Sequence, residues 1–430
     1  MRPRRVLCRS ALPFLLRAST IFLLVLLAAS LVPVLSAQSI PFSGPRDYVV
    51  GAGPDSVVVA DFNGDGRPDI ATANYETNNI SILLQNSDGT FQAAVNYAVG
   101  NEPMSLQIGD VNGDGKLDLL VINFTDATLG VLLGNGDGTF QAQKVTALPG
   151  SPQYYLAVGD FNGDGKADVA FTEQLPQVGT WGVLVMLGNG DATFQPAVSY
   201  LVSGSPAGLA AADFNNDGKL DLASANSPGV SVLLGNGDGT FQAAINTASA
   251  NIEGNLVVAD FNGDGNLDLA TATSGNISGP TLTLFLGNGN GSFQVLVTSQ
   301  EATPLAAGDL NGDGKPDLIA APSNSAPNEV LLNNGDGTFT VGQSLIMANG
   351  GSACALSDLN GQGKLDLVTA LVGANPGDLL PDIVSVLYSN GNGTFANFPS
   401  YVVNPPPQTG YGIALGTLAA ADFNADGKID

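Results

Sequence analysis

Short apolar runs rich in β-branched residues alternate with turns rich in Gly and Asp along most of the chain. One stretch predicts four strands, at Ser56 to Ala60, Ile70 to Asn74, Ile80 to Leu84 and Phe91 to Val99. Gly-rich turns join the first strand to the second and the third to the fourth, whereas a linker of variable length joins the second to the third. No segment keeps a helical period. The pattern predicts an all-β protein built from short antiparallel strands.

This unit repeats through the chain with a period of about 50 residues. The nonapeptide D-F-N-G-D-G-R-P-D beginning at Asp61 recurs in recognisable form at Asp110, Asp160, Asp213, Asp260, Asp309, Asp358 and Asp422. A second motif, typically L-G-N-G-D-G-T-F, ends at Phe91, Phe140, Phe194, Phe241, Phe293, Phe339 and Phe395. Two motifs in a fixed order indicate seven copies of one supersecondary unit and the start of an eighth.

Four strands per repeat are typical of β-propeller blades, which bury their apolar faces against neighbouring blades. A parallel β-helix is the alternative, but its coils are much shorter than this period. Residues 42–50 align with residues 91–99, so we expect this stray fourth strand to complete the last blade and close the ring. Seven blades are favoured over eight, because an eighth needs strands beyond Asp430. We therefore expect a propeller over residues 38–403, followed by a Pro-rich link and a truncated eighth repeat over 404–430.

The first 37 residues have the layout of a secretory signal peptide. Five arginines precede an apolar run from Ile21 to Leu35, and small residues follow it. An uncleaved membrane anchor is the alternative, but the run is short and Pro33 interrupts it. We expect a secreted or cell-surface protein with no stable membrane span after cleavage. Because Cys8 leaves with the peptide, Cys354 has no partner for an internal disulfide.

The balance of charged residues excludes several kinds of catalytic site and partner. The chain has 14 Lys and Arg against 39 Asp and Glu, no His, and a formal charge of −25. Without His, catalytic triads and His-ligated metals are excluded. The negative charge argues against nucleic acid and anionic membranes as partners and favours cations. Because 44% of the residues are hydrophobic and 12% are charged, a large core is expected rather than a disordered acidic tail.

The nonapeptide carries oxygen ligands at a spacing that suits Ca²⁺. Asp, Asn and Asp stand at the first, third and fifth places, Gly at the sixth and Asp at the ninth. Alternate side chains of a tight loop converge on one point, as in the first half of an EF-hand loop. Gly66, Gly115 and Gly165 permit the positive φ that such a loop needs. A metal-free hairpin turn explains the turn residues but not the first and ninth Asp, so structural Ca²⁺ is expected in place of disulfides.

The repeats resemble the FG-GAP or VCBS repeats of integrin α-subunit propellers and secreted bacterial proteins, over residues 42–430. The match to D-x-[DN]-x-D-G-x-x-D implies Ca²⁺ between the first two strands of a blade. The Gly-Ala-Pro element is largely missing, which makes the bacterial type the closer match. The resemblance carries metal ligation onto Asp61, Asn63, Asp65, Asp69, Asp110, Asn112, Asp114, Asp118, Asp160, Asn162, Asp164, Asp168, Asp213, Asn215, Asp217, Asp221, Asp260, Asn262, Asp264, Asp268, Asp309, Asn311, Asp313, Asp317, Asp422, Asn424, Asp426 and Asp430.

Three positions depart from this pattern. Gln362 replaces the fifth-place Asp, so we expect a weak or empty site in the seventh loop. Asn216 and Ala425 replace the fourth-place Gly; Asn tolerates left-handed geometry and Ala does so poorly. The second motif is interpreted as a hairpin turn with a Phe that packs in the core. The apolar second residues of the nonapeptides are also expected in the core: Phe62, Val111, Phe161, Phe214, Phe261 and Leu310.

Blade topology assigns functions to the two ends of the propeller. The first and third turns of a blade share one end, so the acidic loops lie opposite the variable second turns, where ligand contacts are expected. The aromatic candidates are Tyr75, Tyr154, Tyr155 and Trp181. The pattern predicts an extracellular recognition or adhesion scaffold for a protein or glycan, with no catalytic residue. A polysaccharide lyase or hydrolase and a purely structural array are the alternatives, although the carboxylates Glu76, Glu173, Glu253 and Asp378 are isolated in their loops.

Overall fold

The computed structural model describes residues 46–396, apart from 176–178, 253, 255, 275–278, 323–326, 346–352 and 372–381. The predicted signal peptide lies outside the described residues, as do the predicted link and eighth repeat with Asp422, Asn424, Asp426 and Asp430. Within the described part of the chain, no helix is long and apolar enough to cross a membrane.

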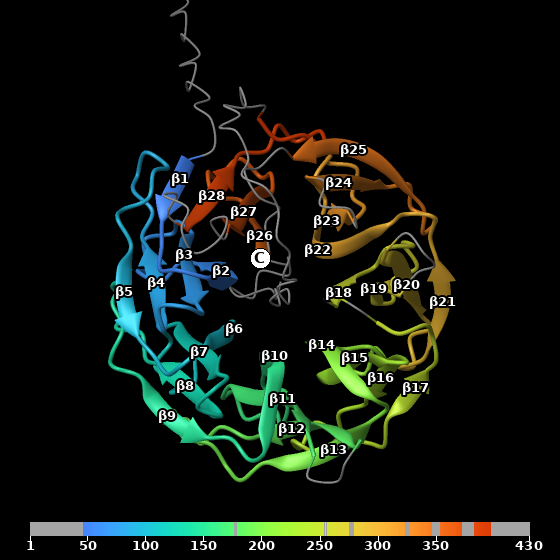
Figure 1. Cartoon of the computed structure of the whole chain (residues 1–430), viewed down its shortest axis with the longest axis horizontal. Coiled ribbons are helices and arrows are strands. Elements are labelled where there is room, and N and C mark those ends of the chain that lie inside the picture. The colour runs from blue at the N-terminus through green and yellow to red at the C-terminus, as the bar shows by residue number, and fades with distance from the viewer. Residues whose placement is uncertain are drawn as a thin grey trace, which may run out of the picture. The chain divides into compact units, whose positions relative to one another are not determined.

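The described residues form seven four-stranded antiparallel sheets that are arranged as the blades of a β-propeller (Figure 1). In blades 1 to 3, from the innermost strand outward, these are β2 (Pro54–Ala60), β3 (Asp69–Asn74), β4 (Asn79–Leu83) and β5 (Val95–Ala98); β6 (Pro103–Gly109), β7 (Asp118–Asn123), β8 (Thr128–Leu132) and β9 (Lys144–Ala147); β10 (Ser151–Gly159), β11 (Asp168–Gln174), β12 (Trp181–Met186) and β13 (Val198–Val202). In blades 4 to 6 they are β14 (Ser205–Ala212), β15 (Asp221–Ser227), β16 (Gly229–Leu233) and β17 (Ile245–Thr247); β18 (Val257–Ala259), β19 (Asp268–Thr273), β20 (Thr281–Gly287) and β21 (Phe293–Val297); β22 (Ala302–Gly308), β23 (Asp317–Pro322), β24 (Asn328–Asn333) and β25 (Phe339–Leu345). Blade 7 combines β26 (Ala353–Ser357), β27 (Asp366–Leu371) and β28 (Ile383–Leu387) with β1 (Arg46–Val49). The all-β, seven-bladed prediction is therefore confirmed.

The N-terminal strand closes the ring, as predicted. Strand β1 pairs antiparallel with β28, with Val49 opposite Ile383. The Tyr48 hydroxyl accepts a hydrogen bond from the Phe91 amide at 3.2 Å, and the two rings pack edge to face with centroids 5.3 Å apart. Because Phe91 belongs to blade 1 and Tyr48 to blade 7, these contacts join the two ends of the ring.

The fourth strand of the first blade is shorter than the sequence pattern predicts. Phe91 forms an isolated bridge with Gln85, and regular pairing resumes only where Val95 lies opposite Ile82. The register shifts by one residue between these two pairs, which is the signature of a β-bulge. One extra residue in the outer strand therefore breaks a run that alternation alone presents as continuous.

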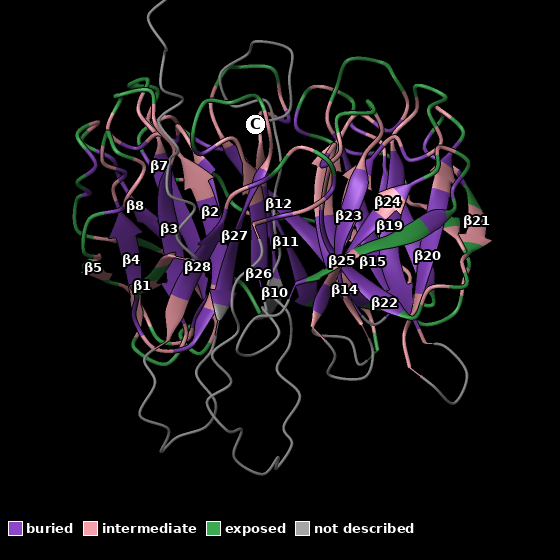
Figure 2. Ribbon diagram, turned by 90° about the horizontal axis from the view of Figure 1, so that it is seen from above, coloured by how far each residue is buried: buried purple, intermediate pink, exposed green. Residues whose placement is uncertain are grey.

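The hydrophobic core is divided into clusters that lie between adjacent blades. One cluster, for example, joins Val57 and Ile70 of blade 1 to Val368 and Val384 of blade 7. Figure 2 shows buried strands through the middle of the propeller and exposed loops at its ends. The predicted core residues of the nonapeptides are all at most 3% exposed: Phe62, Val111, Phe161, Phe214, Phe261 and Leu310. Each blade face is thus buried by its neighbour, which explains why one unit cannot form a core alone.

Candidate metal-binding loops

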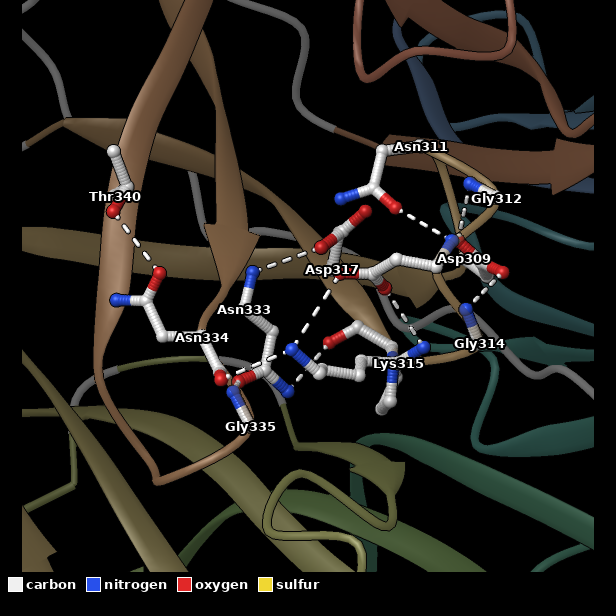
Figure 3. Close-up of polar contacts among 12 residues, drawn as sticks. Asp309, Asn311, Gly312, Gly314, Lys315, Asp317, Asn333, Asn334, Gly335 and Thr340 are labelled. Carbon is white, nitrogen blue, oxygen red and sulfur yellow. Dashed lines mark hydrogen bonds and ion pairs between the residues drawn. The ribbon is translucent and has the colours of Figure 1, made fainter.

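Each acidic loop joins the first two strands of a blade, and its first carboxylate holds the loop in a tight curl. In blade 6, Asp309 Oδ1 accepts hydrogen bonds from the amides of Gly312 (2.7 Å) and Asp313 (3.1 Å), and its Oδ2 accepts one from Gly314 (2.8 Å) (Figure 3). In all seven described loops, the first carboxylate accepts the amides of the fifth and sixth residues at 2.6–3.2 Å. The loop geometry therefore repeats around the ring.

The third and fifth side chains continue the same arrangement. Asn311 Oδ1 accepts the Asp313 amide at 2.8 Å, and Asp313 Oδ1 accepts the Lys315 amide at 3.0 Å (Figure 3). These are Asx turns, in which a side-chain oxygen receives the amide two residues further along. The Lys315 ammonium lies 3.6 Å from Asp313 Oδ2 and donates to the carbonyl of Asn334. One short loop thus carries carboxylate and amide oxygens of the kind that a hard cation needs.

Positive φ angles occur where the sequence pattern requires them. Gly66, Gly115 and Gly165 at the sixth place have φ of 81°, 78° and 80°. Asn216, which replaces the fourth-place Gly in blade 4, has a φ of 59°. The prediction that Asn tolerates left-handed geometry here is confirmed, whereas Ala425 lies outside the described residues.

The ninth-place Asp has a structural role that the spacing does not reveal. Asp118 is fully buried; its Oδ2 accepts the amide of Val111 at 3.0 Å, and its Oδ1 accepts that of Gly134 at 2.8 Å. Val111 lies in the same loop, whereas Gly134 follows the third strand of the blade. The equivalent two bonds form in all seven blades, at Asp69, Asp118, Asp168, Asp221, Asp268, Asp317 and Asp366. This carboxylate therefore ties the acidic loop to the end of the third strand.

Burial makes these ninth-place carboxylates hard to ionise. Loss of solvent raises the pKa of Asp69 and Asp366 to about 7 and that of Asp118 to about 6, while the two amide donors act in the opposite direction. The neighbouring Asp65 and Asp61 raise the pKa of Asp69 further. A cation held in the loop would favour the ionised form of Asp69, because its charge opposes both the loss of solvent and the repulsion by Asp65 and Asp61.

The donor set fits Ca²⁺, although the carboxylates are not gathered into a ready-made cage. Among the described residues, no group of three or more Asp, Glu, Cys or His side chains lies close enough to hold a metal ion. The residue at the third place is Asn in every described loop. Several of the loop oxygens already accept hydrogen bonds from loop amides. Hard oxygen donors in a curl of this kind match the chemistry of Ca²⁺ rather than that of a soft metal.

The seventh loop keeps its shape without the fifth carboxylate. Asp358 accepts the amides of Gln362 (3.0 Å) and Gly363 (2.6 Å), and Asn360 Oδ1 accepts the Gln362 amide at 3.1 Å. The curl around the first carboxylate is therefore retained at Gln362, whereas the bond that the seventh-place amide donates to the fifth side chain in the other six loops is not among the bonds of this loop.

The second motif forms a turn whose Asp is used within the turn. In blade 2, Asp137 Oδ1 accepts both the amide of Thr139 at 3.0 Å and its hydroxyl at 2.5 Å. The Thr139 hydroxyl and amide hold the pKa of Asp137 below its usual value. The Phe140 that follows is 7% exposed. These contacts agree with the interpretation of this motif as a hairpin turn followed by a core residue.

The two motifs also join neighbouring blades, which sequence spacing did not predict. The amide of Gly138 in the hairpin turn of blade 2 donates to the carbonyl of Phe62 in the acidic loop of blade 1 at 3.0 Å. The Phe62 and Phe140 rings pack edge to face at 5.6 Å. Related amide contacts link blade 3 to 4, 4 to 5 and 6 to 7. The fixed motif spacing sets which loop and turn meet across each of these interfaces.

The four aromatic candidates do not form one patch. Tyr75 follows β3 in blade 1 and Trp181 begins β12 in blade 3, and both are half-buried. Tyr155 is 9% exposed and belongs to the cluster between blades 3 and 4. Tyr154 lies in β10, and its side chain is outside what the structure describes. Since blades 1 and 3 are not adjacent, Tyr75 and Trp181 present separate surfaces.

The carboxylates weighed as catalytic groups are also dispersed. Glu76 is exposed in blade 1, whereas Glu173 is 2% exposed in β11 of blade 3. Burial raises the pKa of Glu173 to about 7. Glu253 and Asp378 lie outside the described residues. The described pair occupies separate blades, so it offers no two-carboxylate arrangement of the kind that glycoside hydrolysis uses.

The fold and the repeated acidic loops define a repeat β-propeller. The family model described as FG-GAP-like repeat matches residues 61–121, 110–171, 177–224, 213–271, 260–320, 309–369 and 358–430. The chain belongs to the FG-GAP-like repeat family. A comparison with curated protein sequences gives no match.

Solved structures with the same fold include a lectin and a protein bound to another protein. An Agrocybe aegerita lectin, described for recognition of non-reducing terminal N-acetylglucosamine, has a TM-score of 0.52 and 21% identity and covers 79% of this chain and 92% of its own. BBS1N in complex with ARL6DN has a TM-score of 0.53 and 13% identity, and covers 80% and 95%. A second structure of that complex gives 0.54, 13%, 82% and 98%. At these identities the likeness concerns the fold alone.

Proposed function

We propose that this chain is a secreted, calcium-stabilised propeller that recognises an extracellular protein or glycan. The observation that carries the proposal is a contrast between two connections of the same blade. The acidic connection between the first and second strands has eight residues in every blade. The connection between the second and third strands has four residues in blade 1, six in blade 3, one in blade 4 and seven in blade 5.

The constant connection suits a structural ion. Within each of the six complete loops the first, third and fifth side chains would hold Ca²⁺; in blade 2 these would be Asp110, Asn112 and Asp114. Bound Ca²⁺ would supply positive charge that neutralises the loop carboxylates and restrains the curl. The chain's own amides already hold the first carboxylate in place, so the loop needs little reordering to accept the ion.

The variable connections suit recognition, because a rigid scaffold with loops of different lengths is a common design for binding. Trp181 stands at the border of one such connection and is half-buried, so part of the residue is accessible to solvent. An aromatic face of this kind can stack on a sugar or anchor a protein contact. The lectin and the BBS1N complex support this choice of ligand classes by showing that the fold serves both.

A glycan and protein binding array, run with Ca²⁺ and with EDTA, tests the proposal. We expect binding in Ca²⁺ that is lost in EDTA and reduced by Trp181→Ala. Val198→Ala is the matched control, since Val198 is 52% exposed on the outer strand of the same blade and pairs with Val185, at the end of β12 away from the variable connection. Binding that ignores both Ca²⁺ and Trp181 would contradict the proposal, and turnover of an arrayed polysaccharide would favour the enzymatic alternative.

A further inference from the structure

The two ends of the propeller differ in the sign of their side-chain charges. The acidic loops and the hairpin turns lie at one end of each blade, and the connections between the second and third strands lie at the other, which we name the variable end. Arg46 lies opposite Val386 where an outer strand begins, and the Lys144 ammonium donates to the carbonyl of Asp191 in a hairpin turn at 3.2 Å. The other described basic residues occupy the seventh place of an acidic loop. Every Lys and Arg that the structure describes therefore lies at the acidic-loop end: Arg46, Arg67, Lys116, Lys144, Lys166, Lys219, Lys315 and Lys364.

The variable end carries carboxylates instead. The described acidic residues at this end are Asp55, Glu76, Glu102, Asp126, Glu173, Glu301, Glu329 and Asp382. None of them belongs to a nonapeptide, so Ca²⁺ held in the acidic loops would leave their charge in place. Among the described residues, this end presents negative charge that no Lys or Arg offsets, which favours a cationic partner and disfavours an anionic one.

Three of these carboxylates, on Glu76, Glu102 and Asp126, form what we name the acidic patch of blades 1 and 2. Asn101, in the link between the two blades, donates to Asp126 from its backbone amide at 2.7 Å and from its side chain at 2.8 Å. The Asn101 side-chain oxygen accepts a hydrogen bond from the Asn78 side chain at 3.1 Å, and Asn78 accepts the amide of Glu102 at 2.9 Å. The two bonds from Asn101 hold the pKa of Asp126 below its usual value, so this carboxylate is ionised. The acidic patch thus joins the variable connections of two neighbouring blades.

In blade 3, a buried carboxyl at the same end lacks a hydrogen-bond partner. Asn74, Asn123 and Asn226 end the second strands of blades 1, 2 and 4 with hydrogen-bonded side chains. Glu173 takes this place in blade 3, where it is 2% exposed and its Oε2 has no partner among the described residues. A Cβ added to Gly150 would lie 2.0 Å from Glu173 Oε1, so the carboxyl lies against this exposed glycine of the link between blades 2 and 3. A cationic group beside Gly150 would supply the partner that Glu173 lacks.

We propose that the variable end of blades 1 to 3 binds a basic segment of a protein, with its Lys or Arg side chains on the acidic patch and one of them beside Gly150, next to Glu173. Carboxylates on three successive blades suit an extended chain that carries several cations, whereas a neutral glycan gains little from them. This inference rests on the proposed function, which places recognition at this end, and it narrows the partner to a cationic protein.

Two decapeptides of opposite charge, one of alternating Lys and Ser and one of alternating Glu and Ser, provide the probe. Fluorescence polarisation of the labelled peptides on the full chain, with Ca²⁺ in excess, measures binding while the acidic loops are occupied. We expect saturable binding of the lysine peptide, at least about tenfold tighter than that of the glutamate peptide and weaker as salt is added. Equal affinities for the two peptides would overturn the proposed partner class.

A pair of double variants locates the site. Glu76→Gln with Glu102→Gln removes two charges from the acidic patch and keeps an acceptor oxygen at each place, so we expect about a tenfold loss of lysine-peptide affinity. Asp88→Asn with Asp137→Asn is the matched control, because it removes two charges at the acidic-loop end by a change that two other hairpin turns carry naturally. The control should bind as the original chain does. Equal losses in the two variants would show that the peptide responds only to overall charge and would refute the proposed site.

Proton release tests the part of Glu173. Burial raises the pKa of Glu173 to about 7, and a cation beside it would lower that pKa, so binding of the lysine peptide at pH 7 should release protons. Calorimetry in buffers of different ionisation enthalpy measures this release, which Glu173→Gln should abolish. The same release in the original chain and in the variant would contradict the placement beside Gly150. A glycan that binds through Trp181 while the lysine peptide does not bind would leave the proposed function standing and overturn this inference.

Discussion

At the scale of single residues, the buried ninth-place carboxylate is the feature that holds each blade's acidic loop in place. Its two oxygens receive amides from two separate segments, as Asp118 does from Val111 and Gly134. The sequence shows an Asp at fixed spacing, and spacing alone suits a metal ligand equally well. The second partner of this carboxylate follows the third strand of the blade. No local pattern in the nonapeptide can therefore reveal that partner or the burial of the carboxylate.

Asp118→Asn tests this bracing role. The amide nitrogen would face a backbone donor, so one buried amide loses its acceptor, and we expect a loss of about 1–3 kcal/mol in the free energy of unfolding. Urea denaturation followed by circular dichroism measures it. Asp137→Asn is the matched control, because Asn290 and Asn392 already occupy the equivalent hairpin position in other blades. Equal urea midpoints for the two variants would argue against the brace.

The same carboxylates predict how stability depends on pH without metal. Burial raises the pKa of Asp69 and Asp366 from 3.8 to about 7 in the folded chain, so the folded state binds more protons than the unfolded state between the two values. The free energy of unfolding should therefore fall as the pH rises from about 4 to about 7. Urea titrations in EDTA across this range measure the slope. Stability that is constant or rises across this range would contradict the raised pKa values, because unshifted groups give no slope and lowered pKa values give a rise.

At the scale of elements, the acidic loop and the hairpin turn act as a pair across the blade interface. Strand positions, turn residues and core Phe residues were predictable, because alternation and turn chemistry are local. The bulge after Phe91 and the bond from Gly138 to Phe62 were not, because they depend on how two segments meet in space. The conformation of Asn216 was predictable, since it follows from intrinsic backbone preference.

Two single substitutions test the assignment of Ca²⁺ to these loops. Gln362→Asp restores the fifth carboxylate in a loop that already has the right curl, so calorimetry should find one more Ca²⁺ site per chain. Asp114→Gln makes the reverse change in blade 2 and should remove one. Since the seventh loop folds with Gln at this place, neither variant should unfold the loop. Unchanged stoichiometry in both variants would show that the fifth carboxylate is not a ligand.

At the scale of the whole molecule, closure by β1 joins residues that are more than 330 positions apart, such as Ser385 and Asp47. A chain that begins at Gly51 would lack β1 and leave β28 as an open edge. We expect a clearly lower melting temperature and faster amide hydrogen exchange over residues 383–387. A chain that begins at Gln38, after the predicted signal peptide, is the control. Equal stability of the two chains would mean that the ring does not depend on this strand.

The distribution of acidic residues is also a property of the whole molecule. Of the 39 acidic residues, 28 lie in the two turn motifs, so the excess negative charge is concentrated in turns rather than spread over the surface. The cavity of about 780 Å³ at the centre of the propeller, in contrast, could not be predicted from any one repeat, because residues of all seven innermost strands line it.

Thermal unfolding with Ca²⁺ and with EDTA tests the central claim most directly. At a tenfold excess over the dissociation constant, each site adds about 1.4 kcal/mol, and the six complete loops among the described residues would add on the order of 8 kcal/mol. This is comparable to the whole stability of an ordinary domain. The account predicts that EDTA lowers the melting temperature by many degrees and that added Ca²⁺ restores it. A melting temperature that is the same in Ca²⁺ and in EDTA would contradict it.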